Sequence, residues 1–459
     1  MDATVVNLAL PALGRDLHAD FAGLQWTVNA YTLTLAAFIL LGGSLGDRFG
    51  RRRIFVLGTL WFAAGSALCA LAPSIEVLVA ARALQGIGGA LLTPGSLAII
   101  AASFTERDRS RAIGAWSGLG GLAGAVGPFI GGYLLSGPGW RWVFLINLPL
   151  AGIVIAIAQR HLAESRDPDA GPHLDLVGAV LGAVGLAGLT YALTSAGGGW
   201  SQGAVLGIVL GVAAAVAFVV NERRSTQPML PPDIFANRQF TAANVVTFVV
   251  YAALGGMFFF LVVDLQVVAG FSPLVAGTAL LPITLIMLVL SERSGALAGR
   301  IGPRVPMSLG PIIGACGVLL LLRVGPGASY VADVLPGVSV FALGLSLIVA
   351  PLTSTVLAAA EARHAGIASG INNAVARTAG LVAVAALPLL AGLSGADYGD
   401  AETFAVGFRA AVISCAALLA LGGLIAAVTI RNPALIHAAP RPARRVYCAV
   451  DGPPIQQRS

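Results

Sequence analysis

Long apolar runs separated by short polar breaks follow one another along the chain from its start to about residue 430. A helix needs about 20 apolar residues to cross the roughly 30 Å hydrocarbon core of a bilayer, whereas the strands of a membrane barrel would alternate in units of about 10 residues. The pattern therefore predicts an all-α integral membrane protein. Its fourteen predicted spans are residues 2–16, 24–45, 54–72, 77–101, 112–136, 143–160, 174–196, 204–220, 240–269, 274–291, 306–323, 331–352, 366–392 and 405–430.

The overall composition leads to the same class of protein. Hydrophobic residues make up 57% of the chain and charged residues only 10%, whereas soluble domains carry about 25% charged residues. A soluble enzyme or a soluble binding module is therefore excluded.

The basic residues indicate how the spans are oriented. Lys is absent, so all 27 basic residues are Arg; 21 of them lie in the tail and in the loops on the side of Arg48, and four in the opposite loops. Cytoplasmic loops carry the excess of basic residues, so both termini are expected in the cytoplasm, with the protein in the cytoplasmic (inner) cell membrane. The net charge of +6 is then a signal of topology rather than of nucleic-acid binding.

The first predicted span is short, because residues 1–13 alone precede the polar stretch 14–20. At 1.5 Å per residue they cover roughly 20 Å, about two-thirds of the hydrocarbon core. We therefore expect that the first helix is truncated, and either that the native reading frame begins upstream or that this form has lost proton coupling.

An internal repeat is present at an offset of 252 residues. The stretch GSLGDRFGRRR, residues 43–53, aligns with GALAGRIGPRV, residues 295–305, and GAWSG at 114–118 aligns with GIASG at 366–370. Two matches at one offset favour duplication of a six-span unit, with coincidence among Gly-rich helices as the alternative. Spans one to six and nine to fourteen would be the two copies, and the seventh and eighth an inserted pair.

Several motifs resemble those of the major facilitator superfamily. The GSLGDRFGRRR loop resembles its signature loop, LVAARALQGIGGALLTP at 78–94 its fourth-helix motif, and GAVGPFIGG at 124–132 its antiporter motif. The stretches DATVVNLALP at 2–11 and WRWVFLINLP at 140–149 resemble the fourteen-helix drug–proton antiporter branch. The resemblance implies two six-helix bundles related by a pseudo-two-fold axis along the membrane normal, plus two inserted helices.

The expected domains follow from the spans and the repeat. Residues 1–160 form the N-terminal bundle, 161–238 a linker that carries the two inserted helices, 239–430 the C-terminal bundle, and 431–459 a disordered cytoplasmic tail.

Two motifs are expected to form the moving parts. The gating loop comprises Gly43, Asp47, Arg48, Gly50 and Arg52, in which the glycines let helix ends approach and Asp47 can meet an Arg or a helix N-terminus across the cytoplasmic face. A plain positive anchor is the alternative role for the arginines. The antiporter helix comprises Gly124, Gly127, Pro128, Gly131 and Gly132, where the glycines permit close packing and the proline favours a kink. Ordinary packing of small residues is the alternative role for this helix.

Ionisable residues within spans are costly and mark function by default. The candidates for proton coupling are Asp2, Arg82, Gln85, Arg377 and Asp264. Asp2 is the first choice for the protonated carboxyl, because desolvation raises the pKa of such a group; at a frayed, hydrated helix end it would instead titrate normally and coupling would be lost. Structural ion pairs or carbonyl contacts are the alternative roles for the two arginines.

Polar and aromatic residues of the first, second, fourth and fifth spans and their counterparts in the second copy are candidates for the substrate cavity, with core or interfacial packing as the alternative. They are Trp26, Asn29, Tyr31, Trp116, Phe258, Phe259, Asn372 and Asn373.

The resemblance implies a proton-coupled multidrug or small-molecule efflux transporter that works by alternating access. Its expected partners are small amphipathic solutes, protons and the lipid bilayer, with no nucleic acid, no cofactor, no metal and a monomeric state. The alternatives are an exporter of one endogenous metabolite and a non-transporting membrane sensor. An intramembrane enzyme is disfavoured, because all five His map to loops or tail.

Overall fold

The computed structural model describes residues 2–103, 126–127, 129–166, 174–196, 199–225, 228–359, 365–393, 397 and 400–432. Within these ranges twelve helices are long and apolar enough to cross a membrane, and each matches one of the predicted spans. The principal helices are α1 (Asp2–Asp16), α2 (Phe21–Phe49), α3 (Arg51–Leu71), α4 (Ile75–Ser103), α6 (Arg141–Leu145), α7 (Asn147–His161), α8 (Leu176–Ser195), α9 (Gln202–Arg224), α10 (Arg238–Val267), α11 (Pro273–Thr278), α12 (Leu281–Ile301), α13 (Arg304–Leu320), α14 (Leu335–Ala358), α15 (Ala365–Leu390) and α16 (Ala401–Thr429).

Two predicted spans lie outside this set of twelve. The first corresponds to α1, which has 15 residues. Most of the fifth lies outside the described residues, and its end, 129–136, is helical. Two other spans are each made of a short helix followed by a long one, α6 with α7 and α11 with α12.

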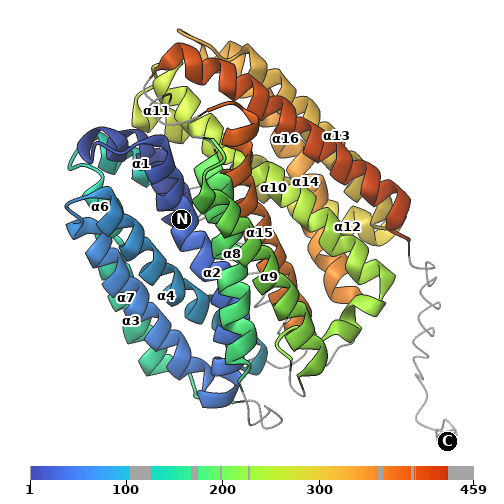
Figure 1. Ribbon diagram of the computed structural model, residues 1–459. Helices are drawn as coiled ribbons and strands as arrows, with labels where there is room; N and C mark the ends of the chain where they lie inside the picture. The colour runs from blue at the N-terminus through green and yellow to red at the C-terminus, as the bar shows by residue number, and fades with distance from the viewer. Residues whose placement is uncertain are drawn as a thin grey trace, which may run out of the picture.

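The helices form two groups that lie side by side (Figure 1). In the first half, α1 to α7, the pairs α2–α4, α3–α4 and α3–α7 pack together; in the second half, α10 to α16, the pairs α13–α14, α10–α16 and α12–α14 do so. Helix α10 is the most enclosed of the candidate spans. The core of the second half is built around its buried aromatic residues, such as Phe260 against Phe404.

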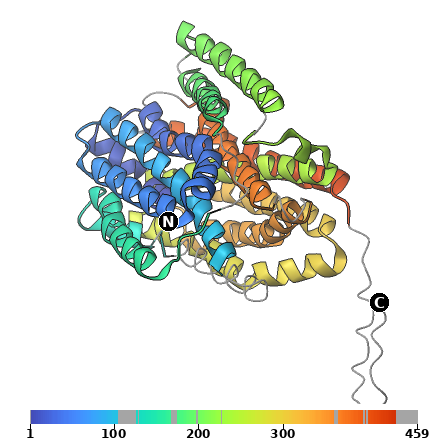
Figure 2. The ribbon, with the colours of Figure 1, turned by 90° about the horizontal axis from the view of Figure 1, so that it is seen from below.

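The pair α8–α9 stands outside both groups. Helix α8 packs against α2 of the first half and α15 of the second, and α9 packs on α8 as the outermost helix in Figure 2. At the start of α8, the Asp175 carboxylate accepts a hydrogen bond from the Gly178 N–H at 2.7 Å and two from the Asn221 amide of α9 at 2.9 and 3.1 Å. One carboxylate therefore caps α8 and joins it to α9.

Helices α2 and α15 run antiparallel along the seam between the halves. The Gln25 side chain donates a hydrogen bond to the Val384 carbonyl at 2.8 Å, and further along, Leu40 reaches Gly370. The two pairs are separated by nearly the same number of residues on α2 and on α15, so the antiparallel helices stay in register over about four turns.

Other contacts between the halves lie near the start of α2. The Gln266 amide of α10 donates to the Leu8 carbonyl of α1 at 3.1 Å, and the rings of Phe21 and Phe259 meet edge to face at 6.0 Å. By the predicted topology this is the extracellular end. Among the described residues, side chains of the two halves therefore meet along the α2–α15 seam and again at the end opposite Asp47.

Candidate functional site

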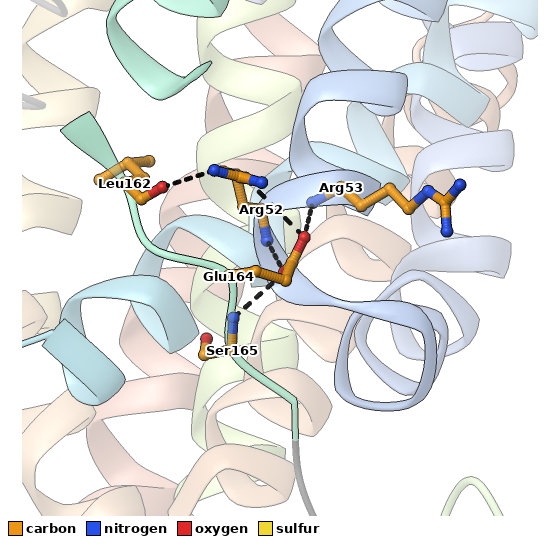
Figure 3. Close-up of polar contacts among 5 residues, drawn as sticks. All are labelled: Arg52, Arg53, Leu162, Glu164 and Ser165. Atoms are coloured by element: carbon orange, nitrogen blue, oxygen red, sulfur yellow. Dashed lines mark hydrogen bonds and ion pairs between the residues drawn. The ribbon is translucent and has the colours of Figure 1, made fainter. Parts of the chain in front are cut away.

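The signature loop folds around the carboxylate of Glu164, a residue that the sequence motifs did not indicate. Gly50 joins α2 to α3 with φ +113°, and the Glu164 carboxylate lies over the start of α3. It accepts hydrogen bonds from the backbone N–H groups of Arg52 at 3.1 Å, Arg53 at 3.2 Å and Ser165 at 3.1 Å (Figure 3). An acidic side chain at a helix N-terminus satisfies otherwise unpaired donors and opposes the helix dipole.

The same loop is fastened to the end of the first half by further bonds. The Arg52 guanidinium donates to the Leu162 carbonyl at 2.9 Å and lies 3.8 Å from the Glu164 carboxylate. The backbone N–H of Arg51 donates to the Ser165 carbonyl at 2.9 Å. Residues 162–165 directly follow α7, so the last helix of the half is tied to the start of its third helix.

The second half repeats this arrangement with different chemistry. Gly302, which aligns with Gly50, also has a positive φ, +88°, and the Asn432 side chain after α16 accepts from the Arg304 N–H at 3.1 Å. The Arg304 guanidinium donates to the Ala427 carbonyl of α16 at 2.7 Å. The aligned arginines thus bind the end of the last helix in both halves, which supports the repeat.

Asp47 pairs within its own loop. Its carboxylate lies 2.8 Å from the Arg51 guanidinium, one turn further on. Arg48 lies over the Phe49 ring at 5.2 Å. Among the described residues Asp47 has no hydrogen bond or ion pair with the second half, so a lock across the cytoplasmic face remains a prediction.

Arg82 is buried in the first half, with 1% of its surface exposed. Its guanidinium donates to the Gln85 side chain at 2.6 Å and to the Thr27 carbonyl at 3.1 Å, and it lies 4.2 Å from the centre of the Tyr31 ring. The Gln85 amide in turn donates a hydrogen bond to the Ser66 hydroxyl at 2.7 Å. The structure therefore brings together Arg82, Gln85 and Tyr31, which the sequence assigned to coupling and to the cavity.

The polar candidates of α15 have different surroundings. The Asn372 amide donates to the Thr247 hydroxyl at 2.8 Å and to the Asn244 side chain at 3.2 Å, both on α10. Asn373 is exposed and bonds within its own helix. Arg377 is exposed and makes no hydrogen bond or ion pair within the described residues.

Asp264 lies near the end of α10 and has no exposed surface. Neither carboxylate oxygen has a hydrogen-bond partner within the described residues, although Arg409 on α16 is close enough to act on its charge. A charged group in this setting is costly unless it is paired or takes up a proton. Asp2 begins α1, and its side chain lies outside the described part of the structure.

The aromatic candidates divide into packed and partly accessible side chains. Phe259 is fully buried against Phe21, so it is a core residue in this conformation. Phe258 is partly buried and meets Phe341 edge to face at 6.2 Å. Trp26 is also partly buried, and Trp116 lies outside the described residues.

The end of the antiporter helix makes close contacts on two sides. A Cβ on Gly131 would lie 2.6 Å from a Val5 methyl of α1, and one on Gly132 would lie 2.6 Å from the Leu274 Cα of α11. Gly132 therefore allows the first half to approach the backbone of the second. Gly127 is buried in a helical segment. Gly124 and Pro128 lie outside the described residues.

Comparison with known proteins agrees with the motifs and the fold. Residues 1–385 match the family model of the Major Facilitator Superfamily. The chain is 37% identical over 379 residues to the multidrug resistance protein Stp of Mycobacterium tuberculosis, covering 82% of this chain and 70% of that protein. It is 36% identical to the methylenomycin A resistance protein of Bacillus subtilis, covering 91% and 90%.

The fold also matches a solved transporter. The crystal structure of the POT family transporter PepTSo superposes with a TM-score of 0.67 at 16% identity, covering 93% of this chain and 94% of that chain. This likeness concerns the fold alone. The chain is thus a multi-pass membrane protein of the transporter class, and it belongs to the Major Facilitator Superfamily.

Proposed function

We propose that this protein exports small amphipathic molecules, including drugs, across the cytoplasmic membrane by alternating access. The observation that carries the proposal is the similarity over 91% of the chain to a protein named for antibiotic resistance. A second relative is named for multidrug resistance.

The structure supports a mechanism in which two rigid halves move against each other. Each half ties the start of its third helix to the end of its last, through Glu164 in one and Asn432 in the other. The contacts between the halves in the described part of the chain include the α2–α15 seam and the glycine approach at Gly132. Rocking about a central site then needs only the contacts between halves to change.

Inward proton movement is the proposed energy source, supplying about 2.3 kcal/mol per charge for each 100 mV of membrane potential, plus the pH term. Asp264 and Asp2 are the proposed proton carriers, and the network of Arg82 and Gln85 is proposed to respond to their charge. The assignment of Asp264 is supported by its burial and by the absence of a hydrogen-bond partner for its carboxyl in the described part of the chain.

The remaining features belong to the same proposal. The protein acts as a monomer with both termini in the cytoplasm. Residues 1–160 and 239–430 are the rocking bundles, and residues 161–238 link them through α8 and α9. The excess of Arg on the Asp47 side supports this orientation.

The test uses inverted membrane vesicles that contain the protein and a panel of amphipathic drugs. Uptake of drug into vesicles with an acidic interior, and its loss when the pH gradient is collapsed, is the expected result. Uptake that is independent of the gradient would instead make the protein a facilitator, and no uptake of any drug would favour a sensor.

A further inference from the structure

Arg377 is a charged side chain near the middle of α15. It lies 12 residues from the start of the helix, roughly 18 Å along its axis. Its side chain is exposed and has no acidic partner within the described residues. Placing a charge at membrane depth costs free energy, so an exposed guanidinium at this depth indicates a functional role.

Neighbouring residues show which way Arg377 faces. A Cβ on Gly370 would point at Leu40 of α2, 3.1 Å away, whereas the Asn372 side chain points at α10. Arg377 follows Gly370 by seven residues, about two helical turns, and so lies on the side of α15 that faces α2. Helix α15 packs on both α2 and α10, and Arg377 lies on its α2 side, at the seam between the halves.

A second polar group lies on the opposite side of this seam. Asn29 follows Gln25 by one turn of α2, and Gln25 binds the Val384 carbonyl of α15, so Asn29 also faces α15. By the register of the two helices, Asn29 is about 5 Å along the axis from the level of Arg377. Asn29 is fully buried, and neither its amide nitrogen nor its oxygen has a hydrogen-bond partner within the described residues.

The chemistry of these two groups points to one class of ligand. A guanidinium presents a planar fork of donors that fits a carboxylate with two parallel hydrogen bonds, and an unpartnered amide can donate a further one. We infer that Arg377 and Asn29 form an anion-binding subsite at the seam, and that this transporter favours amphipathic solutes carrying a carboxylate. The inference rests on the proposed efflux function and names its substrate class.

The test compares an anthraquinone carboxylic acid with the matching primary amide, which has the same ring system and almost the same size. Binding is measured to the full-length protein in lipid nanodiscs, and export in energised inverted vesicles. The variants are Arg377→Gln, Arg377→Lys and Asn29→Leu. Arg323→Gln is the matched control, because Arg323 is exposed at the far end of the same half.

The wild type is expected to bind and export the acid at least about tenfold better than the amide, the usual scale of a charged hydrogen bond. Arg377→Gln should remove this preference by weakening the acid more than the amide, and an unchanged monodisperse elution profile of the purified variant reports an intact fold. Arg377→Lys and Asn29→Leu should keep part of the preference, and Arg323→Gln all of it.

Three outcomes would overturn the subsite: no preference for the acid in the wild type, an unchanged preference in Arg377→Gln, or equal loss of acid and amide in that variant. Acid-selective binding that depends on Arg377, without export of either solute, would keep the subsite and overturn the efflux function instead.

Discussion

The Glu164 carboxylate accepts a hydrogen bond from the backbone N–H of Arg52 at 3.1 Å, although the two residues are 112 positions apart. The Arg52 guanidinium also donates a hydrogen bond to the Leu162 carbonyl, two residues before Glu164. The end of the first half is thereby closed onto the start of its third helix, and Asn432 plays the same part for Arg304 in the second half.

Removing the cap should loosen the first half. Glu164→Ala leaves the N–H groups of Arg52 and Arg53 without their acceptor, and we expect a loss of about 1 kcal/mol of stability. The thermal unfolding midpoint in detergent measures it, with the exposed Glu292→Ala as the control. Equal midpoints for the two variants would contradict the role of the Glu164 cap.

Any side chain at Gly50 should lower the stability of the protein. Its φ of +113° is unfavourable for other residues, and a Cβ would lie 2.7 Å from the Glu164 carboxyl. Gly50→Ala should therefore cost at least about 1–2 kcal/mol, visible as a lower yield of monodisperse protein and a lower unfolding midpoint. Gly299→Ala is the control, because nothing lies within 4 Å of its added Cβ. A Gly50→Ala protein as stable as this control would refute the argument.

Asp47→Asn should slow turnover more than it weakens substrate binding. The change removes the charge that pairs with Arg51 and leaves the proposed substrate site untouched. Transport rates over a range of drug concentrations separate the two effects. If Asp47→Asn is silent while Arg52→Gln impairs transport, the loop is an anchor of topology rather than a gate.

Gly132→Val should hinder the closing of the two halves. Even the Cβ would lie 2.6 Å from the Leu274 Cα across the seam, and that backbone cannot move aside cheaply. Export should fall while the amount of protein in the membrane is unchanged. Gly152→Val is the control in the same half, since nothing lies within 4 Å of its added Cβ, and equal export by the two variants would refute the prediction.

Much of the fold could be predicted from the sequence because apolar runs report directly on membrane spans. The basic loop and its repeat could also be predicted, because Gly50 aligns with Gly302 in the sequence, and the structure gives both glycines a positive φ. Glu164 was missed because its partner, Arg52, is distant in the chain and nothing in the local pattern around residue 164 suggests a cap. The packing of α8 against both α2 and α15 was likewise not readable from its uniform Ala, Gly, Val and Leu composition.

The candidate site was predicted less completely, because burial depends on which helices meet. Arg82, Gln85 and Tyr31 do come together, as their spacing on neighbouring spans allowed. Phe259 was grouped with the cavity, yet it is sealed against Phe21 of the other half. The isolation of Asp264 could be seen only once α10 was surrounded by its neighbours.

Proton exchange for drug is the central claim, and the most direct measurement is proton movement itself. Inverted vesicles are acidified inside, a pH-sensitive dye follows the gradient, and an amphipathic drug is added outside. In wild-type vesicles the drug is expected to speed the decay of the pH gradient. In Asp264→Asn and Arg82→Gln vesicles both this drug-induced decay and the uptake of drug should be slower. Drug uptake into wild-type vesicles with no accompanying proton movement would contradict proton-coupled export.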